Sequence, residues 1–224
     1  MGKANITDTS KAAASNTHSV KPKPIYDFVK RVFDIVCSLI GLIVLSPVFI
    51  IISILIKTTS EGPVFFAHKR VGKSDSALRA YKFRSMVTNA EELIKQFTPE
   101  QKAEYEKNFK LENDPRVTKV GKFMRKTSLD ELPQLINILK GDISVVGPRP
   151  VMDVETKIYG NYRDMLLSVK PGLTGFWAAN GRSATTYTRR RAMEIYYVKN
   201  RSVLLDLKII FKTFISVFKR VGAI

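Results

Sequence analysis

An uncharged run of 22 residues, from Ile35 to Ile56, places the strongest constraint on how this chain can fold. A run of that length is enough to cross a bilayer as a helix. Ser46 and Pro47 interrupt it, and a proline inside a helix removes a backbone hydrogen bond at a cost of roughly 3 kcal/mol. Because no water reaches hydrocarbon to satisfy the carbonyl that is set free, the break needs an explanation beyond anchoring.

Basic residues flank the run on both sides. They are Lys21, Lys23, Lys30 and Arg31 before it, and Lys57, Lys69, Arg70 and Lys73 after it. The basic residues of a single-pass helix are usually concentrated at its cytoplasmic end, so two basic flanks favour a segment that enters and leaves through one leaflet. Ser46 and Pro47 then mark the turn of a re-entrant helix, and the Ser46 hydroxyl can bond a carbonyl of the preceding turn. A kinked helix that spans the bilayer is the alternative.

The remaining sequence predicts an α+β fold, mostly helical, with a small β element. Residues 1–24 indicate a flexible tail, residues 25–60 the membrane segment, and residues 61–224 a cytoplasmic domain. Thr98 and Gln101 have the spacing of a capping box at the start of a helix. The predicted elements are a strand or hairpin at 61–73, helices at 89–97 and 98–109, a helix ending at residue 141, a strand and stiff loop at 141–150, a glycine-rich loop at 170–187, and helices at 188–200 and 202–222.

The last predicted helix is amphipathic. Leu207, Phe211, Phe214 and Phe218 recur at helical spacing, whereas Lys208, Lys212 and Lys219 share a different face. A basic amphipathic helix of this kind can lie in the headgroup plane of a membrane. A helix that packs its apolar face into the core and exposes its lysines is the alternative.

The charge of the chain indicates an anionic partner. It has 37 Lys and Arg residues against 20 Asp and Glu residues, for a formal charge of +17. Nucleic acid, anionic lipid headgroups and phosphorylated substrates all fit such a surplus. The apolar run favours lipid and phosphate, and we expect no nucleic-acid binding because no nucleic-acid signature accompanies the arginine run at 189–191, which we interpret as a solvated or headgroup-facing surface.

The side-chain inventory also limits the chemistry. With one cysteine and two histidines far apart, any metal site must use carboxylates and a hard cation. No phosphate-binding loop of the G-x-x-x-x-G-K-[ST] type and no G-x-G-x-x-G dinucleotide motif is present. Candidate chemistry therefore falls on carboxylates and on the basic groups around them.

The segment "SLDELPQL", residues 128–135, holds the best carboxylate candidates. A helix that starts at Ser128 or at Asp130 places Asp130 and Glu131 at its N-terminus, and the later start better accommodates Pro133. Acidic side chains there can simply complement the helix dipole. Two adjacent carboxylates can also hold magnesium and the phosphates that it bridges, and an aspartate can attack phosphorus itself.

Basic residues near this segment favour the chemical interpretation. Arg125 and Lys126 precede the acidic pair, and Arg149 is fixed between Pro148 and Pro150 in "GPRP". Arginine suits a transferring phosphoryl group because its planar fork binds two oxygens at once.

The motifs together resemble one family. "KRVFDIVCSLIGLIVLSPVFIIISILIK", "GPVFFAHKRVGK", "YKFRSM", "RKTSLDELPQLINILKGDISVVGPRP", "KPGLTGFWAANGR" and "YYVKNRSVLLDLKII" are similar to motifs of the monotopic phosphoglycosyl transferases, the bacterial sugar transferase family, in a compact catalytic form. The resemblance implies a re-entrant helix broken at Ser-Pro. It also implies transfer of a sugar-1-phosphate from a UDP-sugar to undecaprenyl or another polyprenyl phosphate, with release of UMP, on the cytoplasmic face of the bacterial inner membrane.

The resemblance also implies site residues. Asp130 is expected to be the nucleophile and, with Glu131, to bind magnesium, or manganese in its place. The predicted substrate- and phosphate-binding residues are Lys82, Arg84, Arg125, Pro148, Arg149, Pro150, Arg182 and Asp206.

Several finer questions stay open. The resemblance favours UDP-galactose or UDP-glucose over N-acetylated or diacetamido sugars, and implies a first membrane step of capsule, exopolysaccharide or O-antigen assembly. A homodimer is compatible with the sequence. Outside this family, a basic membrane-anchored nucleic-acid or scaffold protein without catalysis and an enzyme with a spanning helix are the alternatives.

Two mechanisms are open for the transfer. In a direct route, the acidic pair only holds magnesium while the lipid phosphate attacks the UDP-sugar. In a two-step route, Asp130 displaces UMP and carries the sugar phosphate. We favour the second, because a carboxylate carries less charge than a phosphate, and we expect the helix terminus and basic neighbours to lower the pKa of Asp130.

Overall fold

The computed structural model describes residues 20–108, 111, 113–181 and 185–218. Its fold is α+β and mostly helical, as predicted. Helices α1 (Pro24–Val44) and α2 (Ser46–Thr59) form a pair that is bent by 60° at Leu45. Among the described helices, none alone is long and apolar enough to cross a membrane, whereas this bent pair meets the criterion jointly, by length and composition.

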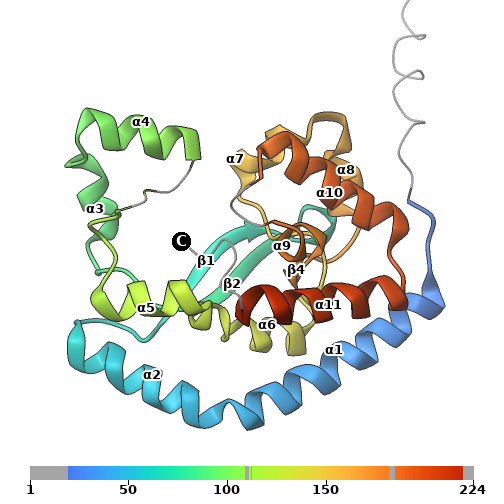
Figure 1. Cartoon of the computed structure of the whole chain (residues 1–224), viewed down its shortest axis with the longest axis horizontal. Coiled ribbons are helices and arrows are strands. Elements are labelled where there is room, and N and C mark those ends of the chain that lie inside the picture. Colours follow the sequence, from blue (N-terminus) through green and yellow to red (C-terminus); the bar gives the residue numbers. More distant parts are fainter. Residues whose placement is uncertain (1–19, 109–110, 112, 182–184, 219–224) are drawn as a thin grey trace, which may run out of the picture.

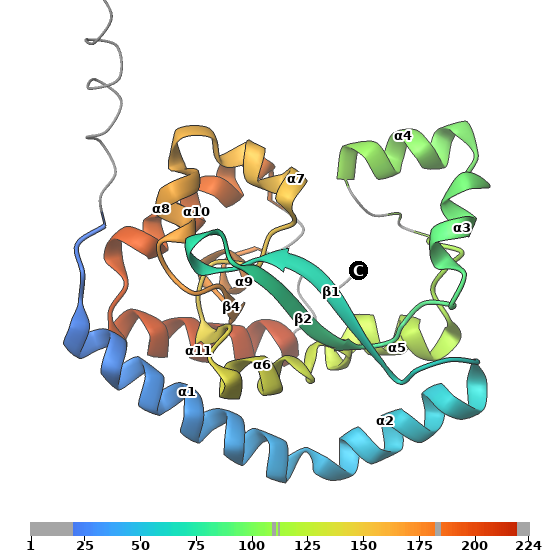
Figure 2. The same ribbon diagram turned by 180° about the vertical axis from the view of Figure 1, so that it is seen from behind.

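The break follows from Ser46 and Pro47. The proline lies in the first turn of α2, where its missing N–H would have had no intrahelical partner. The Ser46 hydroxyl donates a hydrogen bond of 2.8 Å to the carbonyl oxygen of Ile43, as expected. Figures 1 and 2 show the pair as a shallow arc along one edge of the molecule, with the remaining chain on its concave side.

The described residues form two small sheets of two strands each. Strand β1 (Phe65–Val71) lies within the strand or hairpin predicted at 61–73, whereas its partner β2 (Ala77–Phe83) lies beyond it; the two form an antiparallel hairpin, with Phe65 opposite Phe83. A 3-10 turn, η1 (Lys73–Asp75), connects them. Strands β3 (Ser144–Val146) and β4 (Gly172–Thr174) run parallel; a Cβ on Gly172 would lie 2.0 Å from the Gly147 nitrogen, so the close approach requires glycine.

The two polar helices form as predicted. Helix α3 spans Ala90–Lys95 and helix α4 spans Pro99–Asn108. The Thr98 hydroxyl accepts from the Gln101 N–H at 3.3 Å, and the Gln101 amide oxygen accepts from the Thr98 N–H at 3.0 Å. This confirms the capping box.

The acidic segment differs from the prediction. Helix α5 (Lys119–Thr127) ends at Ser128, which has a positive φ of 59°. A 3-10 turn, η2 (Leu129–Glu131), follows, and helix α6 (Gln134–Lys140) begins only after Pro133. Asp130 and Glu131 therefore lie on a turn between two helices instead of in the first turn of α6, which ends at Gly141 as predicted.

The second half contains short elements that the sequence did not predict. They are α7 (Asp153–Thr156), η3 (Lys157–Tyr162), α8 (Arg163–Leu167) and, within the expected glycine-rich loop, β4 and α9 (Phe176–Ala179). Each is too short for a periodic signal, and buried contacts of Tyr159 in η3 and of Met165 and Leu166 in α8 hold these two elements in place. Helix α10 (Tyr187–Asn200) agrees with the prediction, and α11 (Val203–Phe218) agrees with it as far as residue 218; predicted residues 219–222 lie outside the described residues.

Polar contacts bind α1 to the rest of the fold. Arg31 donates from Nη1 to the Ile138 carbonyl at 2.7 Å and from Nη2 to the Leu139 carbonyl at 2.8 Å, at the end of α6. The buried Asp34 carboxylate accepts from the Ser144 hydroxyl and the Val145 N–H, both at 2.9 Å. The first half of α1 is thereby fixed against β3 and α6.

The far end of α2 is fixed as well. Ile52 and Ile56 are buried against Phe83 and Met124. Arg84 donates from Nε to the Pro63 carbonyl at 2.6 Å and from Nη2 to the Ser60 carbonyl at 3.0 Å. Both ends of the bent pair are therefore held by the same folded body.

Apolar side chains are exposed on the bent pair and on α11. Among the described residues of α11, Leu204, Leu207, Phe211 and Phe214 are exposed, while Ile209 is buried. The apolar face predicted for this helix thus points outward, which contradicts the core-facing alternative. Of the predicted tail, residues 1–19 lie outside the described residues, as does Lys219, whereas Lys23 donates to the Arg201 carbonyl at 2.7 Å.

Candidate active site

The acidic pair lies on η2, beside strand β2. Lys82 on β2 places its Nζ 2.6 Å from Glu131 Oε1 and 3.9 Å from Asp130 Oδ2. The Asp130 side chain is 10% exposed and the Glu131 side chain 31%. The structure therefore brings together three of the predicted site residues, two carboxylates and the ammonium group between them.

The pKa of Asp130 corrects the expectation from the sequence. Burial raises it from 3.8 to about 6, with a further increase from Glu131, and the charges of Lys82 and Arg125 only partly offset this. The expected helix-terminus effect is missing because Asp130 is not in the first turn of α6. At neutral pH its carboxyl is still mostly ionised.

Glu131 behaves differently because it is closer to the ammonium group. Burial alone would raise its pKa, but the charge and hydrogen bond of Lys82, followed by the charges of Arg149 and Arg70, lower the pKa overall. Both carboxylates are thus available as anions at neutral pH, and Asp130 is the more basic of the two.

Three arginines form a second group, called here the arginine cluster: Arg70 on β1, Arg149 in the "GPRP" loop and Arg190 on α10. Arg70 Nη1 and Arg190 Nη1 each donate to the buried Glu155 carboxylate at 3.3 Å. The guanidinium groups of Arg149 and Arg190 lie over the ring of Trp177, 5.6 and 4.9 Å from its centroid. Within the described residues, the Nε atoms of Arg149 and Arg190 are buried without a hydrogen-bond partner.

The arginine cluster lies next to the acidic pair. Arg149 and Arg70 both lower the pKa of Glu131. His68 on β1 is close to the same charges: burial, together with Arg70, Lys82 and Arg149, lowers its pKa to about 4. His68 is therefore uncharged at neutral pH, and the positive potential of this region comes from Lys82, Arg70 and Arg149.

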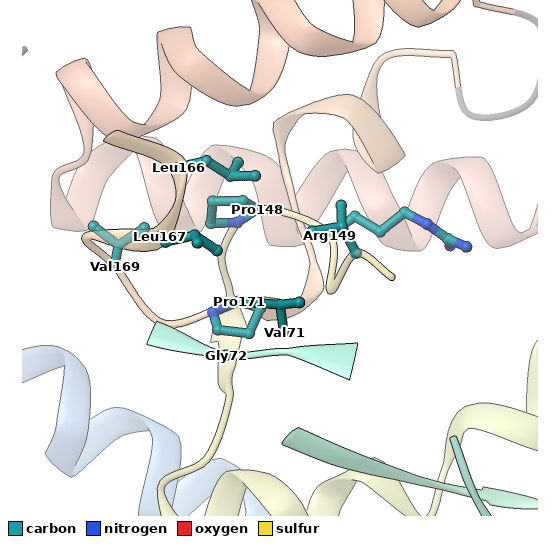
Figure 3. A pocket seen from close by; sticks show the side chains of 9 residues that line it. Val71, Gly72, Pro148, Arg149, Leu166, Leu167, Val169 and Pro171 are labelled. Atoms are coloured by element: carbon teal, nitrogen blue, oxygen red, sulfur yellow. The ribbon is translucent and has the colours of Figure 1, made fainter. Parts of the chain in front are cut away.

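The loop around Arg149 is anchored by its neighbours. Figure 3 shows Pro148 among Leu166, Leu167 and Val169, with the Arg149 side chain directed away from them. Pro148 is one of the residues that line a cavity of about 10 Å³ at this point, which is too small for a substrate. Pro150 is half-buried beyond it.

The Arg149 backbone has its own partner. Its N–H donates to Glu194 Oε1 at 3.1 Å, and burial raises the pKa of Glu194 to about 7. This bond, the buried position of Pro148 and the Trp177 ring together fix the direction of the Arg149 guanidinium group.

The other predicted site residues lie in several places. Arg125 donates from Nε to the Ser85 hydroxyl at 3.0 Å, and its charge lowers the pKa of Asp130, so it belongs to the acidic pair. Arg84 instead bonds the carbonyls that follow α2. Asp206 accepts from Lys30 at 2.6 Å and from Tyr197 at 2.8 Å, which links α1 to α11. Arg182 lies outside the described residues.

Several residues in and around the arginine cluster were not predicted from the sequence. Arg190 belongs to the arginine run that was interpreted as a solvated surface, yet it is buried, because α10 directs it toward Glu155. Glu194 lies four residues after Arg190, on the same face of α10. This pair of opposite charges could have indicated from the sequence that the face points inward. Arg70, Glu155, His68 and Trp177 lacked a local pattern that would have singled them out.

The carboxylates of this site can bind a hard cation only together with ligands from elsewhere, such as water or a substrate phosphate. In the described ranges, no group of three or more His, Cys, Asp or Glu side chains converges on one point. Asp130 and Glu131 offer two adjacent carboxylates, and magnesium usually binds through one or two carboxylates, several waters and substrate phosphates. The residues therefore fit a magnesium ion that shares its ligands with a bound phosphate.

Comparison with known proteins identifies the family. Residues 25–220 match bacterial sugar transferase. The chain is 48% identical over 199 residues to undecaprenyl-phosphate galactose phosphotransferase of Salmonella typhimurium, which covers 88% of this chain and 42% of the relative. It is 42% identical over 194 residues to an exopolysaccharide production protein of Sinorhizobium fredii, and this match covers 85% of this chain and 86% of the relative.

A further relative has a similar extent. UDP-glucose:undecaprenyl-phosphate glucose-1-phosphate transferase of Escherichia coli is 38% identical over 207 residues, covering 85% of this chain and 42% of the relative. The chain thus spans less than half the length of the Salmonella and Escherichia relatives and most of the Sinorhizobium one. With the family match extending over most of its length and including the acidic pair and the arginine cluster, this chain belongs to the bacterial sugar transferase family.

Proposed function

We propose that this chain transfers a hexose-1-phosphate from a UDP-hexose to a polyprenyl phosphate and releases UMP, through a covalent intermediate on Asp130. The observation that carries the proposal is the buried Asp130 carboxylate, 3.9 Å from Lys82 and beside an arginine cluster. An ionised but basic carboxylate suits nucleophilic attack, and nearby cations suit the charge of a diphosphate.

The arginine cluster supports binding of the donor diphosphate. Arg70, Arg149 and Arg190 bring three positive charges, against the single full negative charge of Glu155. A buried surplus of positive charge is costly unless an anion offsets it, and guanidinium groups bind phosphate oxygens in pairs. A diphosphate on the exposed side of Arg149 would provide that anion and would lie next to Asp130.

The proposed chemistry has two displacements. An oxygen of the Asp130 carboxylate attacks the phosphorus that carries the sugar, and the bond from that phosphorus to the bridging oxygen breaks, so that UMP leaves with that oxygen. A phosphate oxygen of the polyprenyl phosphate then attacks the same phosphorus, and the bond to Asp130 breaks, which regenerates the carboxylate. The product is a polyprenyl diphosphate hexose.

The neighbouring residues have distinct proposed roles. Lys82 keeps Asp130 ionised and offsets charge on the transferring phosphoryl group, while Glu131 completes the carboxylate pair. Magnesium, held by Asp130 and Glu131, would neutralise the phosphate charge when bound.

The names of the relatives support a hexose donor. Of the relatives described above, one name mentions galactose and another glucose. We therefore propose UDP-galactose or UDP-glucose as the donor and place the reaction at the first membrane step of a bacterial surface glycan. A panel of UDP-sugars that includes N-acetylated and diacetamido forms would identify the donor by UMP release.

The bent helix pair supports a monotopic placement on the cytoplasmic face of the membrane. The folded body packs against the pair on both sides of the break: Leu42 of α1 and Leu45 at its end lie against the cluster that holds Leu135. Val48 and Phe49 of α2 lie against the cluster that holds Phe83 and Met124. Because the body covers one side of the pair up to the break, neither helix can extend alone across a hydrocarbon layer of about 30 Å, so we propose that the pair enters one leaflet and returns.

A single-turnover experiment tests the proposed function. The full chain in detergent micelles, with UDP-hexose and magnesium but no acceptor, should release about one UMP per active site in a burst. The peptide that contains Asp130 should gain the mass of a hexose phosphate, and Asp130→Asn should abolish both signals. Asp164→Asn, at an exposed aspartate on α8, is the matched control and should keep them.

The same experiment has an outcome that contradicts the proposal. If UMP is released only when the acceptor is present, and rapid quenching traps no adduct, the direct route replaces the two-step route. If no UDP-sugar in the panel yields UMP with or without acceptor, the transferase function itself is wrong.

A further inference from the structure

A groove between α9 and α11 has no role in the site described above. Its volume is about 200 Å³. Phe176 on α9 and Leu205, Ile209 and Phe211 on α11 form its apolar walls. The Phe176 ring is fixed by its contact with Tyr196, at 4.9 Å between ring centroids, so this wall is part of the folded structure.

The rim of the groove is cationic. Lys208 and Lys212 line it from successive turns of α11, and no acidic residue is among the lining residues. Lys212 Nζ donates to the Asn180 side-chain oxygen at 3.0 Å, across the gap between the two helices. The groove thus combines an apolar floor with a positively charged edge.

The exposed apolar face of α11 continues from the groove. At about 100° per residue, Leu207, Phe211 and Phe214 share one face of α11, and Lys208 and Lys212 lie between this face and the buried Ile209. A molecule that matches this surface has an apolar chain and an anionic head. Its chain would occupy the groove and continue from it directly into the bilayer.

We propose that this groove captures the polyprenyl phosphate acceptor, with the chain segment next to the phosphate between α9 and α11 and the phosphate paired with Lys208 and Lys212. This inference rests on the proposed function, which supplies the acceptor. The groove is smaller than the roughly 300–1,000 Å³ of pockets that enclose drug-sized ligands, so it holds only the start of the chain and leaves the rest in the bilayer.

The position of the groove connects it to the active site. Phe176, in its wall, directly precedes Trp177, whose ring lies under the Arg149 guanidinium group. Arg149 in turn lowers the pKa of Glu131. Helix α9 therefore contributes Phe176 to the proposed groove and Trp177 to the contacts of the arginine cluster.

Photochemical labelling tests this groove without relying on turnover. A polyprenyl phosphate with a diazirine in its first isoprene units is irradiated with the full chain in detergent micelles. The label should appear on peptides of α9 and α11, and unmodified polyprenyl phosphate should compete for it. If the label appears elsewhere, or if polyprenol or dioleoyl phosphatidate competes equally well, the proposed acceptor groove is wrong.

Kinetics on two matched variants give a second test. Phe211→Ser changes a groove wall, whereas Phe214→Ser changes an equally apolar, exposed position on the same helix that does not line the groove. Phe211→Ser, and the double change of Lys208 and Lys212 to Gln, should each raise the KM for polyprenyl phosphate by about tenfold. Phe214→Ser should leave it within about twofold.

The outcomes separate the two proposals. An equal effect of both phenylalanine changes means that the helix face binds the bilayer in general, which overturns the groove. A missing UMP burst in the unmodified chain counts against the proposed function alone, because the labelling result still decides whether the groove binds the lipid phosphate.

Discussion

Replacing the buried Asp130 carboxyl by an uncharged amide should stabilise the protein while abolishing its activity. The pKa of Asp130 rises from 3.8 to about 6 on folding, mainly because burial penalises its charge. Each pKa unit corresponds to 1.36 kcal/mol, so the ionised carboxylate lowers the free energy of unfolding by about 3 kcal/mol at pH 7.5. Asp130→Asn removes this penalty.

The sign of the effect gives it a characteristic pH dependence. Because the native pKa lies above the unfolded value, the native protein loses stability as the pH rises from about 4 through 6. The amide does not titrate, so the advantage of Asp130→Asn should be full above pH 7 and should vanish toward pH 4.

Thermal unfolding in detergent micelles, followed by Trp177 fluorescence, measures this difference. A chain of this size gains roughly 2–4 °C in Tm per kcal/mol, so the expected increase for Asp130→Asn is about 6–12 °C at pH 7.5. Asp164→Asn, whose side chain is 95% exposed, should show no such pH-dependent gain. A variant that is no more stable than the native chain, or equally more stable at pH 4.5 and 7.5, would refute the reasoning.

Three further predictions concern turnover and topology. Arg149→Lys keeps the charge but loses the paired hydrogen bonds, and should lower kcat/KM at least tenfold with little change in Tm; near-native turnover would remove Arg149 from the site. The rate of the UMP burst should fall about tenfold from pH 7.5 to pH 5 as Asp130 is protonated, and Lys82→Met should move the midpoint upward, as a pH-rate profile would show. Impermeant labels should reach Lys21 and Lys57 from the same side of a vesicle, whereas replacing the Ser-Pro break by Leu-Ala should favour a continuous helix; labelling from opposite sides in the native chain would contradict the re-entrant placement.

The elements that could be predicted from the sequence are those with a local chemical signal. Ser46 and Pro47 mark the break, because proline has no N–H to donate and serine has a hydroxyl to offer. Thr98 and Gln101 mark the start of α4 by a reciprocal pair of hydrogen bonds. In each case the residues that determine the structure lie within a few positions of one another.

The features that could not be predicted depend on contacts between distant segments. Arg190 looks solvated in the sequence, and only its position opposite Glu155, 35 residues earlier, makes it a buried residue. The pKa of Asp130 depends on how deeply the whole fold buries it, which the two carboxylates and their neighbours in sequence do not specify. Short elements such as η3 are held by core contacts and lack the length for a periodic pattern.

The contacts at the two ends of the bent pair have a consequence for hydrophobic matching. Long transmembrane helices adapt to thick or thin bilayers by tilting. Here Asp34 fixes α1 and Arg84 fixes the loop after α2, so neither arm can tilt without disrupting the body that holds Asp130. On the proposed placement, the opposite leaflet does not contact the protein, and the height of Asp130 above the headgroups is set by the fold. The enzyme should therefore work equally well in membranes of different thickness.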